Sequence, residues 1–216
     1  SHNSPCCSSA GRTMQEFRDI YGIELDLAMT PFEYQEYASG LIAKAAERAW
    51  KNRKPGGISY GLGHAVVGRK RLQVDFSGKS GMYGDTQRPE FSHIEGYEDH
   101  SVNLLYTWDK EDNLTGVVIN LACPSQVSES KYYISADFWH DTRMELHKRL
   151  GKNIFILPQA SPSGDQSPHI MVGEEAEARM QKIMFPDVEA GRGSLGRRKQ
   201  IAMDISDAVT SALPYM

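Results

Sequence analysis

Apolar residues follow two kinds of spacing along this chain, one typical of β-strands and the other typical of α-helices. Residues 101–108 and 114–121 are rich in closely spaced apolar side chains and flank the polar stretch KEDN, a pattern that is typical of a β-hairpin. Because residues 114–121 are apolar on both faces, we expect a central strand there. Residues 58–76 also indicate strands, with Gly61 and Gly63 as kinks or bulges.

Helical spacing marks other segments. Residues 30–52 begin with Thr30 as an N-cap, Pro31 in the first turn and Glu33 closing a capping box, so we expect a structural helix with an apolar stripe. Further helices are predicted at residues 174–185 and after Ser194. The second of these carries apolar residues at helical spacing, namely Ile201, Ile205, Ala208, Val209 and Ala212.

A strand–helix–strand pattern spans about residues 114–158. The strand ending at Leu121 is followed by a helix that Ser135 caps and Gly151 ends, and then by an apolar strand that Pro158 ends. Such crossovers join parallel strands, whose carboxyl ends share one edge of the sheet. We therefore predict an α/β fold with a mixed, partly parallel sheet flanked by helices, in a single domain over residues 1–216.

The same topology brings two polar loops together. Residues 123–126 follow the first strand of this unit and residues 161–169 follow the second, so both loops should line one pocket at the sheet edge. The second loop gathers hydroxyls, a carboxylate and an imidazole, and catalytic loops are commonly built in this way. Its composition fits a turn rich in Ser, Pro and Gly equally well.

Basic residues cluster at Arg69, Lys70 and Arg71, in or just after a strand. A solvated face is one interpretation of this cluster. In the other, an arginine points into a site and holds an anion or a carbonyl oxygen. The cations around the start of the last helix, including Arg197, are expected to be solvated. His93 and His100 lack metal-ligand spacing and are interpreted as structural.

Composition and charge narrow the function. The chain has 216 residues and a net charge of −4, which disfavours a basic nucleic-acid surface. No apolar run approaches the roughly 18 residues of a membrane span, and we find no signal peptide. Three cysteines cannot make a disulfide framework. The abrupt start, with His2, Cys6 and Cys7 close together, suggests a piece of a longer protein.

Three stretches resemble the neutral/alkaline ceramidases. Residues 164–169, GDQSPH, resemble the GDVSPN loop whose serine is the family's proposed nucleophile. The stretch GVVINLACPSQVSESKYYISADF is similar to a family strand that leads to a THGTSM motif and an ISGD segment. The first residues, SHNSP, resemble the tail of a THTHSGP motif. The resemblance covers the middle of the family's catalytic domain, because the remaining zinc ligands lie beyond Met216.

The resemblance implies a hydrolase that cleaves the amide bond of an N-acyl lipid, such as a sphingolipid amide, or of a related small molecule. An extracellular or periplasmic location follows from it. Ser167 would be the nucleophile, and the family arginine that helps to bind substrate falls on Arg71, with Arg69 as the alternative position. Gly164 would let the backbone approach closely.

Zinc is the cofactor that the resemblance implies. Two family zinc histidines fall on His2 and Cys123, and both cysteine and histidine are normal zinc ligands. Asp165 or His169 would supply a third ligand or orient the nucleophile. Cysteine in place of histidine, and Ser4 in place of the second histidine of THTHS, are departures from the family pattern.

A second hypothesis is a non-catalytic member or fragment that keeps the fold without a complete metal site. An ordinary α/β-hydrolase is disfavoured, because no GxSxG elbow is present. Two geometric expectations follow from the first hypothesis. Cys123 and Ser167 should lie about 5 to 12 Å apart, at neighbouring strand ends. The Arg71 guanidinium should point toward the Ser167 loop.

Overall fold

A computed structural model describes residues 19–22, 31–129, 131 and 133–216. These residues divide into two compact units, one of which is Gly56–Met216, while the other contains α2 (Pro31–Lys51). The helix expected at residues 30–52 is confirmed, although Phe32 and Ile42 of its apolar stripe are exposed. The expectation of a single domain stays a prediction. Within the described ranges, no helix has the length and apolar content that a membrane span needs.

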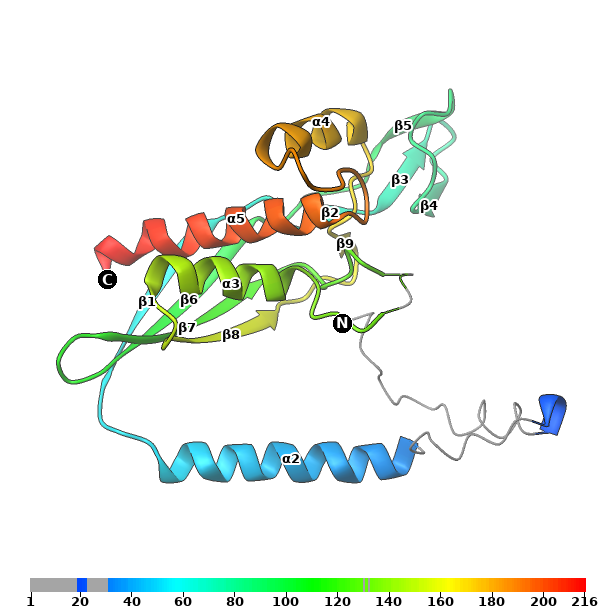
Figure 1. Cartoon of the computed structure of the whole chain (residues 1–216). Helices are drawn as coiled ribbons and strands as arrows, with labels where there is room; N and C mark the ends of the chain where they lie inside the picture. Colours follow the sequence, from blue (N-terminus) through cyan, green and yellow to red (C-terminus); the bar gives the residue numbers. More distant parts are fainter. Residues whose placement is uncertain (1–18, 23–30, 130, 132) are drawn as a thin grey trace. The chain divides into compact units, whose positions relative to one another are not determined.

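A four-stranded sheet in the order β1-β6-β7-β8 forms the centre of the larger unit (Figure 1). Its strands are β1 (Gly57–His64), β6 (Ser101–Trp108), β7 (Leu114–Leu121) and β8 (Phe155–Ala160). β6 pairs antiparallel with both β1 and β7, whereas β7 and β8 are parallel and are joined through α3 (Phe138–Leu150). The predicted hairpin, the central position of residues 114–121 and the mixed, partly parallel α/β fold are therefore confirmed.

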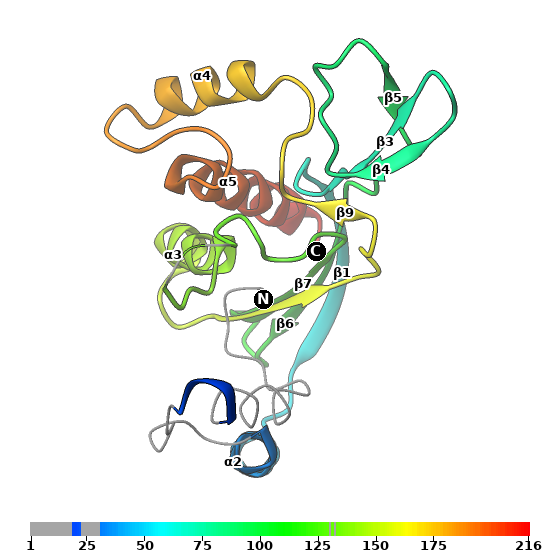
Figure 2. The ribbon, with the colours of Figure 1, turned by 90° about the vertical axis from the view of Figure 1, so that its right-hand side faces the viewer.

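Two helices, α3 and α5 (Leu195–Ala212), lie together on one side of this sheet (Figures 1 and 2). Between them and the sheet lies the core, to which every second residue of the strands contributes. Its largest fully buried apolar members are Val67, Val102, Tyr106, Val117, Ile119, Phe138, Leu146, Ile201 and Ile205. The Tyr106 hydroxyl donates a 2.6 Å hydrogen bond to the Val209 carbonyl, which ties the sheet to α5. The predicted apolar face of α5 is thus confirmed.

The opposite face of the sheet is open within the Gly56–Met216 unit. Tyr60, Leu105, Val118 and Leu157 are successive cross-strand partners, so their side chains lie in one row on one face. Tyr60 is 72% exposed and Leu157 53% exposed, whereas the two central residues are half-buried. One face of the sheet therefore holds the core, and the other is an apolar surface.

Three local expectations are wrong. Gly61 and Gly63 are not bulges, because β1 keeps an unbroken register with β6. A Cβ at Gly63 would lie 2.9 Å from Ala208 of α5, so this glycine allows close helix packing. Pro158 lies inside β8, which is an edge strand and can spare an N–H. Ser135 does not cap α3; its hydroxyl accepts a hydrogen bond from the Asp137 N–H just before the helix.

Shorter elements complete the unit. β2 (Arg69–Lys70) pairs with β9 (Gln166–Ser167), and β3 (Leu72–Asp75) lies between β4 (Ser80–Met82) and β5 (Phe91–Ile94). α4 (Glu174–Met184) precedes α5, and the 3-10 helix η1 (Leu213–Tyr215) follows it. The last helices were predicted from their periodicity and are confirmed.

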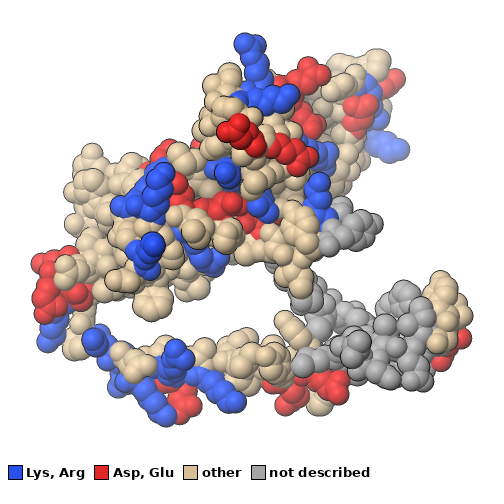
Figure 3. All heavy atoms as spheres, in the orientation of Figure 1, with Lys and Arg blue, Asp and Glu red and all other residues tan. Residues whose placement is uncertain are grey.

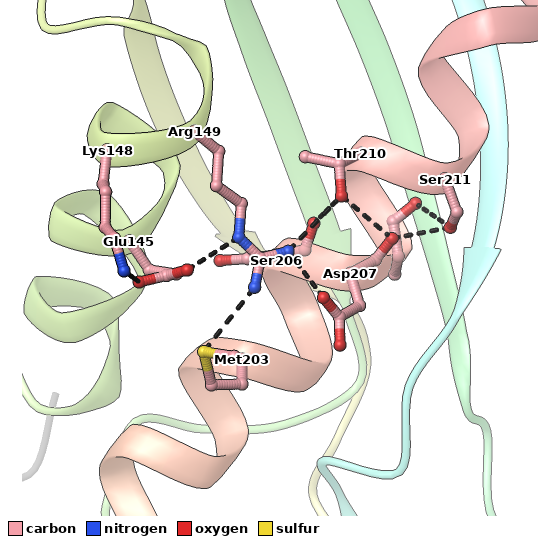
Figure 4. Close-up of polar contacts among 9 residues, drawn as sticks. Glu145, Lys148, Arg149, Met203, Ser206, Asp207, Thr210 and Ser211 are labelled. Carbon is pink, nitrogen blue, oxygen red and sulfur yellow. Dashed lines mark hydrogen bonds and ion pairs between the residues drawn. The ribbon is translucent and has the colours of Figure 1, made fainter.

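Charged side chains join the two covering helices at their outer surface. Arg149 of α3 donates to Glu145 of its own helix at 2.7 Å and to Asp207 of α5 at 2.5 Å (Figure 4). Elsewhere on the face shown in Figure 3, acidic and basic side chains are interspersed.

Asp204 of α5 makes the stability of the fold depend on pH. Burial raises the pKa of its carboxyl from 3.8 to about 6. The folded chain therefore holds this proton more tightly than the unfolded chain, so stability is greatest below pH 4 for this group and is lost as the pH rises through 6. Asp204→Asn cannot ionise and should be more stable than the parent by about 1 kcal/mol at pH 8, a value reduced for partial solvation.

Urea denaturation at pH 4.5 and pH 8 measures this difference. The gain from Asp204→Asn should shrink at the lower pH. An equal gain at both values would contradict the assignment to Asp204 ionisation.

Candidate functional site

The first residues of the two polar loops donate hydrogen bonds to the same carbonyl group. The Leu121 carbonyl at the end of β7 accepts hydrogen bonds from the Cys123 N–H and the Ser161 N–H, each at 3.0 Å. β7 and β8 are parallel and in register to their last residues, so the chain leaves both strands at the same edge. The predicted meeting of residues 123–126 and 161–169 at one sheet edge is therefore confirmed, whereas the shared pocket and the numerical separation of Cys123 and Ser167 stay predictions.

Ser167 is at the centre of this meeting and is 0% exposed. It belongs to β9 and pairs with Arg69 of β2. Its Oγ accepts a 3.0 Å hydrogen bond from the Gln126 side-chain amide and a 3.1 Å bond from the His169 N–H. In the part of the chain that the structure describes, no carboxylate or imidazole accepts a hydrogen bond from the Ser167 hydroxyl. The serine is thus held by donors on two sides.

A buried aspartate fixes the loop that carries Gln126. The carboxylate of Asp137 is 0% exposed and accepts hydrogen bonds from the N–H groups of Val127 at 3.1 Å and Ser128 at 2.7 Å. These two amides directly follow Gln126. Because both carboxylate oxygens are used on this backbone, the Gln126 side chain emerges from a fixed turn toward Ser167.

Arg71 points toward the Ser167 loop, as expected. Its guanidinium donates to the Gly164 carbonyl and, at 2.9 Å, to the Tyr83 hydroxyl. The same hydroxyl accepts a 2.7 Å bond from the Gln126 amide, so Arg71, Tyr83 and Gln126 form a chain that reaches Ser167. Arg69 instead pairs with Glu177 of α4 at 2.9 Å. A substrate-binding role for Arg71 stays a prediction.

Asp165, the residue before β9, is held by Lys70 of β2. The ion pair joins Lys70 Nζ and an Asp165 carboxylate oxygen, and this hydrogen bond lowers the pKa of the Asp165 carboxyl. Asp165 is consequently an ionised carboxylate that fastens the loop to β2. Its proposed role toward the nucleophile or a metal stays a prediction.

The ring of His169 makes its polar contact with Glu129. Its Nε2 lies 2.5 Å from Glu129 Oε1, and the ring meets Tyr83 edge-on with the centroids 5.9 Å apart. Burial lowers the pKa of the imidazole despite the opposing effect of Glu129, so the ring is neutral at pH 7. It is the backbone N–H of His169 that contacts Ser167.

The residues that the structure describes do not fit a zinc site. Cys123 is 0% exposed, and burial raises the pKa of its thiol far above the usual value, which disfavours the thiolate that zinc needs. Its Sγ lies 3.5 Å from the Pro124 carbonyl oxygen. Over the described ranges, no three His, Cys, Asp or Glu side chains are grouped to hold a metal ion. His2 lies outside the described residues.

Sequence reasoning missed Gln126, Tyr83 and Glu129. Gln126 lies inside the stretch that resembles the ceramidases, but on a position to which no role was given. Tyr83 comes from the turn after β4 and has a positive φ of 57°, which is uncommon for a residue other than glycine. Nothing in its neighbouring residues indicates that its hydroxyl meets Arg71 and Gln126.

A polar cavity of about 360 Å³ adjoins this chain of side chains on the Tyr83 side. Its walls are the turn that follows β4 and the segment between His169 and α4. The lining residues include Tyr83, Thr86, Met171, Glu174 and Arg192. The Arg192 guanidinium lies 5.9 Å from the centre of the Tyr83 ring. The cavity offers a small polar group a place beside the loop.

Gly68, rather than Gly164, is the glycine on which the site depends. A Cβ at Gly68 would clash with the Ala122 carbonyl and lie 2.7 Å from the Gln166 side-chain oxygen, whereas a Cβ at Gly164 would meet no atom of the described residues within 4 Å. Gly68→Ala should therefore destabilise the fold by about 1 to 3 kcal/mol. Gly164→Ala, the matched control, should change stability by less than about 0.5 kcal/mol. Equal effects in urea denaturation would contradict the close approach at Gly68.

Comparison with known proteins gives a likeness in structure alone. No protein-family model matches the sequence, and no curated protein matches it. The structure is similar to neutral ceramidase from Pseudomonas aeruginosa, with a TM-score of 0.55 and 15% sequence identity over 80% of this chain. It is also similar to a ceramidase complexed with C2, with a TM-score of 0.51 and 15% identity over 78% of this chain.

The matched region is a small part of those proteins. The alignments cover 25% and 24% of the two ceramidase chains. At this identity the likeness shows the fold and not the chemistry. The chain therefore has a ceramidase-like fold, and it spans about a quarter of the length of the ceramidase structures that it matches.

Proposed function

We propose that this protein is a ceramidase-like hydrolase that cleaves the amide bond of an N-acyl lipid or a related amide, with Ser167 as the nucleophile. One observation carries the proposal. The Ser167 oxygen accepts hydrogen bonds from two donors, at the edge of a ceramidase-like fold where the loops after β7 and β8 meet. The proposal includes an extracellular or periplasmic location, which rests on the resemblance to the ceramidases.

The two donors favour the reactive form of the serine. A hydroxyl is a weak nucleophile until its proton is removed, and donors to its oxygen stabilise the alkoxide that results. The Gln126 amide and the His169 N–H occupy the acceptor sites of Oγ, so the hydroxyl proton is directed to another acceptor. The arrangement prepares Ser167 to lose its proton, although the described residues do not include the base.

Arg71 and Tyr83 would stabilise the charge that develops on the substrate oxygen. The Tyr83 oxygen accepts from Arg71 and Gln126, so its own O–H can donate to a further acceptor such as a substrate oxygen. A phenol that donates beside a guanidinium suits an amide oxygen that becomes negative in the transition state. Arg71 would hold the carbonyl group, and Asp165 would keep the loop against β2.

Zinc enters this proposal only through the resemblance to the ceramidases, which would place it on His2 and Cys123 with Asp165 or His169 as a third ligand. Catalytic zinc usually has three protein ligands. The donors in the described ranges do not complete such a set, so no step of the mechanism above passes through a metal. A small-molecule or lipid substrate is the partner in this proposal, and a nucleic acid is not.

The burial of Ser167 favours a second candidate, a non-catalytic protein that has kept the ceramidase-like fold. A serine that is 0% exposed and accepts two buried donors also suits a purely structural hydrogen-bonding group. The protonated, buried Cys123 fits this candidate as well. The two candidates differ in whether an amide is turned over.

Substitution of Ser167 separates them. If the protein hydrolyses an N-acyl lipid, Ser167→Ala should lower kcat by roughly a thousandfold or more, because the nucleophile is lost. The same change leaves two buried donors without an acceptor, so stability should fall by about 1 to 3 kcal/mol for either candidate. Turnover must therefore be measured per folded molecule, with Ser163→Ala in the same loop as the control.

Three outcomes are informative. Loss of turnover in Ser167→Ala with normal turnover in Ser163→Ala supports the nucleophile. Retained turnover in Ser167→Ala excludes it. If the parent protein turns over no amide or ester and binds no zinc by metal analysis, the non-catalytic candidate is correct.

A further inference from the structure

Arg197 is buried, contrary to the expectation of a solvated basic start for α5. The residue is 2% exposed, and burial lowers the pKa of its guanidinium. Its Nε donates a 3.2 Å hydrogen bond to the Pro168 carbonyl, and Nη1 donates to the Gln200 side-chain oxygen at 3.2 Å. Nη2 is buried and has no hydrogen-bond partner among the described residues. A buried cation without a bonded carboxylate is costly and calls for an explanation.

The explanation lies in the peptide unit that Arg197 contacts. The Pro168 carbonyl and the His169 N–H belong to one planar peptide group and point in opposite directions across a trans bond. Arg197 holds the oxygen of this group, and the N–H at its other end donates to Ser167 Oγ at 3.1 Å. The orientation of the donor to Ser167 is therefore set by the hydrogen bond from Arg197.

The charge on Arg197 also strengthens this donor. A cation at the carbonyl oxygen polarises the peptide group, and hydrogen bonds in such a chain reinforce one another. A more polarised N–H stabilises negative charge on Ser167 Oγ more strongly. The burial of the guanidinium removes the water that would otherwise screen this effect.

A second set of contacts closes the arrangement on the other side of Ser167. Glu177 of α4 accepts from Arg69 at 2.9 Å and from Gln200 at 2.9 Å. Arg69 is the β2 residue that pairs with Ser167, and Gln200 is the residue that accepts from Arg197. The contacts thus form a closed ring. It runs from Arg197 through Gln200, Glu177 and Arg69 to Ser167, and it returns to Arg197 through the Pro168–His169 peptide.

We infer that Arg197 is a positioning residue for Ser167, which aims and polarises the Pro168–His169 peptide, and that Glu177 holds the opposite flank of the serine. This inference rests on the proposed function for its catalytic consequence. Its structural content, the coupling of Arg197 to the His169 N–H, can be measured whether or not an amide is hydrolysed.

Arg197→Lys is the direct test. Lysine keeps the charge but replaces the planar fork with a single nitrogen, which cannot hold Pro168 and Gln200 in the same geometry. Glu177→Gln is a second variant at a less buried position, which keeps the side-chain shape and removes the charge. Arg149→Lys is the matched control, because Arg149 also joins two elements through charged contacts but lies in the α3–α5 contact of Figure 4.

The primary readout is the state of the His169 amide, which is measured by its proton chemical shift and by its rate of hydrogen exchange. Arg197→Lys should move this proton upfield and speed its exchange by about tenfold or more relative to amides of β7, and Glu177→Gln should do so to a smaller extent. Arg149→Lys should lower the melting temperature without this local effect. An unchanged His169 amide in folded Arg197→Lys and Glu177→Gln would overturn the inference.

The kinetic readout is the second half of the test. In a protein that turns over an amide, Arg197→Lys should lower kcat by about 10- to 100-fold with KM nearly unchanged, since small displacements of a reacting group cost this much. Arg149→Lys should keep its kcat. An Arg197→Lys enzyme with full kcat would overturn the inference. Absence of turnover in the parent would instead contradict the proposed function and leave the His169 amide to decide the role of Arg197.

Discussion

The parallel register of β7 and β8 is the constraint on which the candidate site depends. Their pairing continues to Leu121 and Ala160, and the Leu121 carbonyl then accepts the first N–H of both outgoing loops. The loops that begin at Cys123 and Ser161 are far apart in sequence, but both therefore leave the sheet beside the Leu121 carbonyl. Parallel pairing requires a crossover, and α3 supplies it while also covering the core. The connection that builds the hydrophobic core therefore also builds the site.

The site is held by buried polar contacts rather than by apolar packing. Asp137, Gln126 and Arg197 are each almost completely buried, and their polar groups hold backbone or side chains of the two loops. An unpaired polar group in such a place would cost about 1 to 3 kcal/mol, so these contacts stabilise one arrangement against alternatives. A rigid loop is useful to a catalyst and to a purely structural protein alike, which is why the fold alone does not choose between the two candidates.

The features that could be predicted from the sequence are those that depend on residues close together along the chain. The helices and the β6–β7 hairpin have local periodicity and local caps, and the parallel pairing implied by a βαβ crossover then placed two loops at one edge. The same reasoning could not find Arg197, because arginine at a helix start is usually solvated. It is buried here only because the loop after β8 folds over the first turn of α5, where Pro168 presents a carbonyl group. Gln126 and Tyr83 were missed because their hydrogen-bond partners lie in other elements, which a local sequence pattern does not reveal.

The most direct test of the account is the coupling between Gln126 and Ser167, the contact that joins the two loops. A double-mutant cycle with Gln126→Ala, Ser167→Ala and the double variant, followed by urea denaturation, measures this interaction without reference to activity. The account predicts a coupling free energy of about 0.5 to 3 kcal/mol, because the two side chains share one hydrogen bond. Effects that add to within about 0.3 kcal/mol would contradict it, because residues that do not touch behave in that way.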